Sequence, residues 1–125
     1  MMNLRSRDRV VDNAELAARL CADSAEISAA HARHLALHGT LIPHAFMGDV
    51  LARAGECARA GTTNAREPRA ELESILATLE GAMAGGHREA CSVICISFIW
   101  DGEGEPFFAT LRPLLGPRLE AMLRT

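Results

Sequence analysis

The sequence predicts an all-α fold, a single-domain bundle of about five or six helices. Apolar residues recur at three- and four-residue intervals in several segments. Many of these apolar residues are alanine, which favours helix over strand. Short connectors marked by glycine or proline separate the periodic segments. A length of 125 residues, 49% hydrophobic and 23% charged, suits one soluble domain with one core.

Two helices are expected in the first third of the chain, after an N-terminal tail over residues 1–12 that we expect to be flexible. Asn13 is a candidate N-cap for the helix "AELAARLCAD". Asp23 or Ser24 would cap the second helix, "AEISAAHARHLALHG", and Gly39 would end it with a positive φ. One long helix is the alternative, because the apolar residues of both segments keep one phase at 3.6 residues per turn.

Two longer helices are expected in the middle of the chain. Pro43 suits the first turn of "PHAFMGDVLARAGECARA", where a missing N–H is not needed, and Gly61 ends this helix. "GTTNAREP" reads as a polar loop. Pro68 opens "PRAELESILATLEGAMAG", which Gly85 and Gly86 end.

The segment "REACSVICISFIW", residues 88–100, fits either a buried strand or a buried helix. No second strand-like run is available to pair with it, so we expect a helix. "DGEGEP" is expected to be an acidic, flexible loop. "FFATLRPLLGPRLEAML" is either one helix broken at Pro113 or two short helices, the second starting at Pro117.

Charge and hydropathy exclude several classes of function. A net charge of −3 argues against broad nucleic-acid binding, which needs a basic surface, and Arg5, Arg7 and Arg9 read as part of a solvated tail. The longest apolar run, residues 93–100, is too short to cross a bilayer. The charged N-terminus is followed by no apolar signal-peptide core, so a cytoplasmic location is the default expectation.

Four of the five histidines lie between residues 31 and 44. On an ideal helix His31, His34 and His38 share one stripe, and His44 follows one connector later. Imidazoles four residues apart can share zinc or another transition metal, which makes these four residues a candidate metal site. The segment lacks the glutamate of the HExxH motif. Structural histidines and an acid–base site therefore remain open beside the metal site.

The sequence leaves the catalytic residues unknown, and its weak candidates are His44 and Asp49. Asp49 follows His44 by five residues, about one turn away, where a carboxylate can orient an imidazole for general acid–base chemistry or for structure alone. Ser97 is not surrounded by a GxSxG elbow and reads as a small core serine.

The stretch "LIPHAFMGD", residues 41–49, resembles a family of small, uncharacterised bacterial proteins that carry a Leu-Pro-His-x-Phe-x-Gly-Asp motif. "ILATLE", "VICISF" and "LLGPRL" resemble later segments of the same family. The resemblance starts at Leu41. This chain departs from the family after its Ser-Phe, where the family has an acidic residue and an amide residue and this chain has Trp100 and "DGEGEP". It implies a helical fold, singles out His44 and Asp49, and supplies no reaction.

Two hypotheses of function follow. The first is a small acidic interaction module that binds another protein, for example immunity-like binding of a basic partner, with no cofactor, nucleic acid or membrane involved. A homodimer is a further option. The second is a metal-binding or metal-dependent protein that uses the four histidines. On the first hypothesis, the partner-binding candidates are the aromatic and acidic residues Trp100, Asp101, Glu103, Glu105 and Phe107.

Overall fold

The structure is a computed structural model that describes residues 11–61 and 66–124. These residues form helices and contain no strand, so the all-α prediction is confirmed, with more helices than the five or six expected. The helices are α2 (Asn13–Asp23), α3 (Ala25–His38), α4 (Pro43–Gly61), α5 (Arg66–Gly85), α6 (Arg88–Ile94), the π-helix η1 (Cys95–Trp100), α7 (Asp101–Glu103), α8 (Phe108–Leu111), the 3₁₀ helix η2 (Arg112–Leu114) and α9 (Pro117–Glu120).

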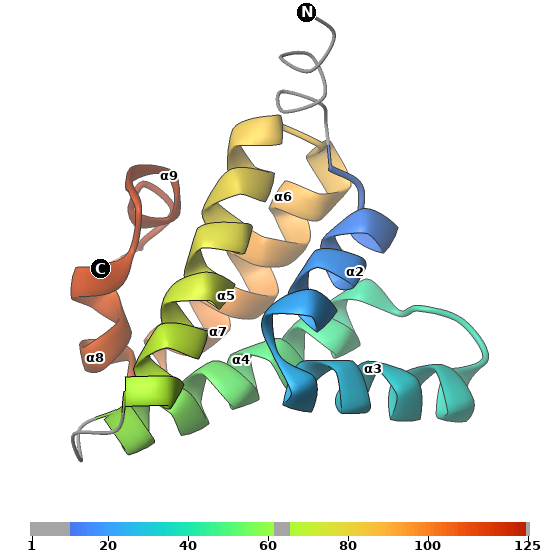
Figure 1. The fold of residues 1–125 in the computed structure, drawn as a ribbon. Helices are drawn as coiled ribbons and strands as arrows, with labels where there is room; N and C mark the ends of the chain where they lie inside the picture. Colours follow the sequence, from blue (N-terminus) through green and yellow to red (C-terminus); the bar gives the residue numbers. More distant parts are fainter. Residues whose placement is uncertain (1–10, 62–65, 125) are drawn as a thin grey trace, which may run out of the picture.

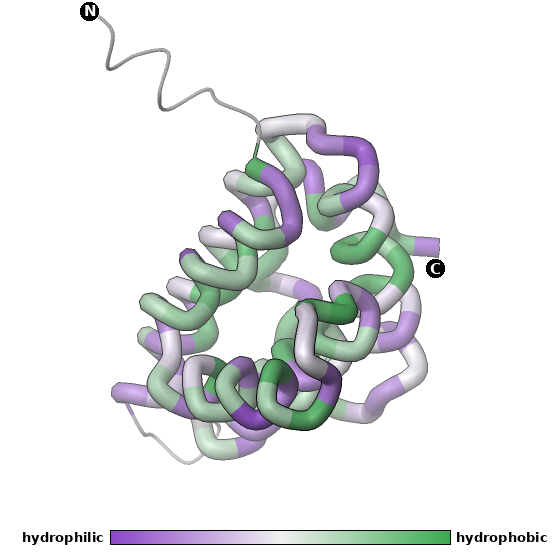
Figure 2. The backbone as a smooth tube through the Cα atoms, turned by 90° about the vertical axis from the view of Figure 1, so that its right-hand side faces the viewer, coloured by the Kyte–Doolittle hydropathy of each residue, from purple (hydrophilic) through white to green (hydrophobic). Residues whose placement is uncertain are grey.

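The core lies between α2, α4, α5 and the continuous rod of α6, η1 and α7 (Figure 1). Hydrophobic and hydrophilic residues alternate along the helices, as amphipathic packing requires (Figure 2). Helix α3 packs on α2 and α4 and lies at the edge of the molecule, whereas α8 and α9 lie on the opposite side, where α9 packs on α5 and α8 on α4 (Figure 1). No helix in the described ranges is both long enough and apolar enough to cross a membrane.

The N-cap of α2 lies one residue before the one that we predicted. The N-cap is Asp12, whose carboxylate accepts a hydrogen bond from the N–H of Glu15, and Asn13 is the first helical residue. Val11 is buried in the core. Residues 11 and 12, which we assigned to the tail, therefore belong to the folded part, and the rest of that tail lies outside the described residues.

Ser24 separates α2 from α3, so the prediction of two helices is confirmed over that of one long helix. Its extended backbone, with φ −151° and ψ 122°, breaks the helix, and its hydroxyl accepts the N–H of Ile27. At the other end of α3, Gly39 has φ +76° and donates its N–H to the carbonyl of Leu35. The predicted positive φ at Gly39 is confirmed.

Replacing Gly39 with valine should lower the free energy of unfolding by about 1–3 kcal/mol, because a β-branched residue is strained at positive φ. No other group lies within 4 Å of the added Cβ, so the loss measures backbone strain alone. Gly39→Asn is the matched control, since asparagine tolerates this region and should cost much less. Urea-induced unfolding measures the stability of both variants, and equal stability of Gly39→Val and Gly39→Asn would contradict the prediction.

Residues 88–100 form a helix, as expected, and this helix continues beyond them. The "DGEGEP" segment is not a loop throughout, because Asp101–Glu103 extends the rod as α7. Gly102 is buried there, and an added Cβ would meet the side chains of Phe108 and Leu51 at 3.1–3.3 Å. Close packing at this glycine explains why an acidic, glycine-rich sequence stays helical.

The C-terminal part forms two short helical pieces, and Pro117 starts the second, as one of our two alternatives predicted. The N-terminal cap of α9 comes from α5. The Glu80 carboxylate accepts the backbone N–H groups of Arg118 (2.9 Å) and Leu119 (3.0 Å). Gly116 lets it approach, because a Cβ there would lie 2.6 Å from the Glu80 carboxyl carbon.

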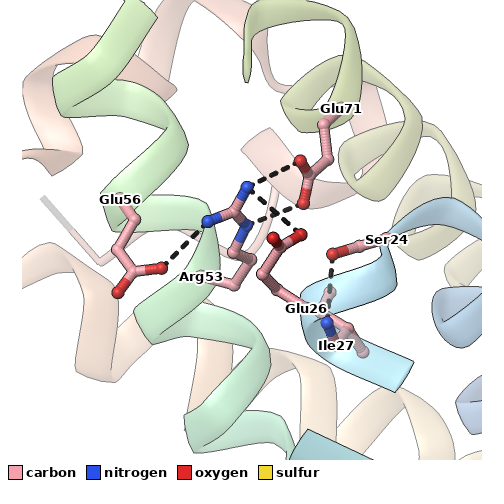
Figure 3. Close-up of polar contacts among 6 residues, drawn as sticks. All are labelled: Ser24, Glu26, Ile27, Arg53, Glu56 and Glu71. Carbon is pink, nitrogen blue, oxygen red and sulfur yellow. Dashed lines mark hydrogen bonds and ion pairs between the residues drawn. The ribbon is translucent and has the colours of Figure 1, made fainter. Parts of the chain in front are cut away.

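Arg53 on α4 joins three helices (Figure 3). Its guanidinium donates two hydrogen bonds to Glu71 of α5, at 2.7 and 2.8 Å, and one to Glu56, at 3.1 Å. Glu26 of α3 lies 3.5 Å away as a further ion-pair partner. The bidentate bond from Arg53 lowers the pKa of Glu71 from its usual value.

Candidate functional site

His44 lies in the first turn of α4, where the sequence placed it, but its partner is one that we did not predict. Its Nδ1 lies 2.7 Å from the hydroxyl of Ser97 in the π-helix η1. Ser97 is buried, with 6% of its surface exposed, whereas His44 is exposed. Asp49, the partner expected from the sequence, makes no hydrogen bond to the ring. The pair instead fixes the imidazole against the core.

The histidines of α3 make separate contacts. His34 is buried, and its Nε2 accepts the backbone N–H of Ile42 at 2.9 Å, which ties α3 to the connector before α4. The rings of His34 and His38 have centroids 4.6 Å apart. His31 packs edge-on against Phe46.

The predicted metal ligands do not converge on one point. Among residues 11–61 and 66–124 there is no group of three or more His, Cys, Asp or Glu side chains placed to hold a metal ion. His44 is turned toward Ser97, and the Nε2 of His34 already accepts a hydrogen bond. The four histidines thus contact Ser97, Ile42, Phe46 and one another without meeting at one point.

Asp49 faces a groove between α3 and α4, so it does not orient His44. Two adjoining hollows, of about 390 and 320 Å³, share the residues Ala30, Arg33 and Asp49. The side chains of Arg33 and Asp49 have no hydrogen bond or ion pair with any residue that the structure describes. We call this the α3–α4 groove; its other lining residues are Glu26, Ala29, His34, Leu37, His38, Ala45, Ala52, Arg53 and Glu56.

Exposed apolar side chains gather at the C-terminal end of α3. Leu37 is 79% exposed, Leu35 is 37% exposed, and Ile42 in the connector is 40% exposed. Within α3 only Ile27 and His34 are buried. The end of this helix and the connector after it therefore leave three large apolar side chains partly or largely in water.

The two aromatic partner-binding candidates are packed within the chain. The indole N–H of Trp100 donates to the carbonyl of Met122 at 2.9 Å, and the guanidinium of Arg124 lies 4.5 Å from the ring centre. Phe107 is half-buried against Gly55 of α4, with the guanidinium of Arg59 5.5 Å from its ring centre. Both rings close the core around the C-terminal part.

The three acidic candidates of the same segment differ from one another. The side chain of Glu103 is 8% exposed; it accepts the backbone N–H of Arg124 and forms ion pairs with Arg112 and Arg124. Asp101 and Glu105 are exposed. The structure therefore brings the five candidates onto one segment but leaves only two of them open to a partner.

The cysteines offer no activated thiol. Burial raises the pKa of Cys21, Cys91 and Cys95, and it raises that of Cys57 to about 11. A thiol with a raised pKa carries little thiolate at neutral pH, so it is a poor nucleophile and a poor metal ligand. The cysteines thus add no reactive group to the histidine and groove residues.

No known family model matches this chain. No curated protein and no solved structure is significantly similar to it.

Sequence reasoning missed Arg53, Ser97 and Glu80 as organising residues. Arg53 carried one local signal, a glutamate three residues later at Glu56. The contacts of Ser97 with His44 and of Glu80 with α9 join residues 53 and 38 positions apart. No periodicity of a single sequence reports such pairings.

Proposed function

We propose that this protein is a protein-binding module whose α3–α4 groove holds a basic segment of another protein. One observation carries the proposal: the same groove is lined by Leu37, which is 79% exposed, and by Asp49, whose carboxylate no described residue binds. An exposed apolar side chain beside an unpaired charge is a common anchor for a partner. The module has no need of a cofactor for this function.

The charge of the groove favours a basic occupant. Three carboxylates, those of Glu26, Asp49 and Glu56, line the groove against two arginines, Arg33 and Arg53, and Arg53 is already shared with Glu71. The first ten residues carry three arginines and one aspartate, so the rest of the chain has a net charge of −5 against −3 overall. An acidic surface speeds the capture of basic partners.

The shape of the groove suits an extended or helical segment. Its lining includes small side chains on both helices, Ala30 on α3 and Ala45 and Ala52 on α4. Small residues let an incoming backbone approach closely. Helix-in-groove binding of this kind uses apolar anchors spaced along one face of the ligand.

A capture experiment with matched surface variants tests this function. Immobilised protein should retain a basic partner from cells that express it natively. Leu37→Glu and Asp49→Lys should each weaken binding of the purified partner at least about tenfold, or about 1.4 kcal/mol. Glu120→Lys, an equal charge reversal on exposed α9, should leave the affinity unchanged.

Isothermal titration with the purified partner gives these affinities, and size-exclusion chromatography with light scattering gives the mass of the protein alone. Equal binding by all variants would contradict the groove. A dimer dissociated by Leu37→Glu would show that a second copy occupies it. Loss of partner binding on Asp101→Lys or Glu105→Lys alone would move the interface to the C-terminal segment.

A further inference from the structure

A second hollow, outside the α3–α4 groove, lies beside His44. It has a volume of about 360 Å³ and is formed where the starts of α2 and α4 meet the first turns of α6. Its polar residues are Asn13, His44, Arg88, Ser92 and Glu89. Its volume lies within the range of small-molecule sites.

The hydroxyl of Ser97 determines which face His44 offers to this pocket. Ser97 is buried, and His44 Nδ1 is the only polar partner that the described residues give to its hydroxyl. A buried hydroxyl without another acceptor is satisfied best by donating to Nδ1. The neutral ring then carries its proton on Nε2, so His44 presents an N–H donor away from the core.

Three further hydrogen-bond donors line the same pocket. The Arg88 guanidinium, the Ser92 hydroxyl and the Asn13 amide have no side-chain partner among residues 11–61 and 66–124. Their donors are therefore open to a ligand. Glu89 is the one carboxylate on the wall, and Pro43 and Val93 form the apolar part.

We propose that this pocket binds a small oxyanion, the phosphate or carboxylate group of a small molecule. A guanidinium, an imidazole N–H, a hydroxyl and an amide together match the several acceptor oxygens of such a group, and arginine recognises it with two parallel hydrogen bonds. Glu89 offsets the charge of Arg88, so capture depends on directed hydrogen bonds and not on charge alone. The pocket should therefore discriminate an oxyanion from chloride.

Ser97 acts in this site as a positioning residue, because it holds His44 without facing the ligand itself. The pocket shares no lining residue with the α3–α4 groove. Oxyanion binding and protein binding can each be present or absent without the other, and the variants below leave the charge of the groove unchanged.

Titration with inorganic phosphate, followed by ¹H–¹⁵N NMR of the full chain, tests the proposal. Phosphate should cause saturable shifts at the amides of His44, Arg88 and Ser92, whereas sodium chloride at equal ionic strength should not. Arg88→Gln should raise the dissociation constant about tenfold, the loss expected for a charge-assisted hydrogen bond. Arg66→Gln removes the same charge from an exposed arginine that lines neither the pocket nor the groove, and it should have no effect.

Two more measurements make the result specific. Ser97→Ala should weaken phosphate binding and change the side-chain ¹⁵N shifts of His44, because the ring loses its fixed tautomer; a merely structural serine would leave those shifts unchanged. Acetate in place of phosphate distinguishes a carboxylate ligand from a phosphoryl ligand, and binding of either supports the site. Absence of saturation with both anions, an equal response to chloride, or equal losses in Arg66→Gln and Arg88→Gln would overturn it.

Discussion

Replacing Arg53 with methionine should lower the free energy of unfolding by about 3 kcal/mol, the lower end of the loss for a broken buried ion pair. The side chains of Arg53 and Glu71 are only 21% and 17% exposed, so the variant leaves a largely buried carboxylate without its two donors. Urea-induced unfolding followed by circular dichroism measures the loss.

The double variant Arg53→Met, Glu71→Met separates the ion pair from simple packing. Removing both charges should restore most of the stability, because an apolar pair of similar size avoids the cost of an unpaired carboxylate. A double variant as unstable as the single one would show that shape, and not charge, is what Arg53 contributes.

At acid pH, the difference in the free energy of unfolding between the wild type and Arg53→Met should become smaller. Arg53 lowers the pKa of Glu71 in the folded state below its usual 4.5, so this carboxylate stabilises the fold above that pH. The contribution disappears as the pH falls through the lower pKa of the folded state. Unfolding curves between pH 3 and pH 7 check the trend, and a constant difference would contradict it.

Replacing Phe98 with alanine should cost about 3–5 kcal/mol, the range for removing a fully buried phenyl ring. Phe98 is 0% exposed and heads the set of large buried side chains. It lies in η1 next to Ser97, so the cavity should also loosen the Ser97–His44 contact. The unfolding midpoint gives the stability, and the His44 side-chain shifts report the contact.

Phe98→Leu is the control for this substitution. Leucine keeps most of the apolar volume, so the loss should stay below about 1.5 kcal/mol. A loss in Phe98→Ala no greater than in the leucine variant would mean that the core closes around the missing ring.

The helix boundaries that the sequence predicted correctly depend on local chemistry. Ser24 caps α3 through an N–H three residues ahead, Gly39 bonds four residues back, and Pro43 fits a first turn without outside help. Such signals lie within one turn of the residue that carries them, so a single sequence contains all of the information.

The candidate site was less predictable, because its contacts join distant segments. The sequence placed His44 at the correct helix end. The hydroxyl that binds it belongs to Ser97. The helix that carries Ser97 was predicted only because no partner strand was available. Its position in a π-helix depends on packing against α4, which no local propensity encodes. The position of Asp49 could not be predicted for the same reason: it lies on α4 as expected, but the packing of α3 on α4 places it on the groove between them.

Because Glu80 caps α9, the folding of the C-terminal part depends on a helix that is synthesised earlier. The chain emerges from the ribosome N-terminus first, so the carboxylate that caps α9 is made 38 residues before Arg118, whose N–H it accepts. A four-residue helix does not persist alone in water. Helix α9 therefore forms only on a nascent chain whose earlier helices are already in place, and protection of the Leu119 amide from hydrogen exchange marks the completion of folding.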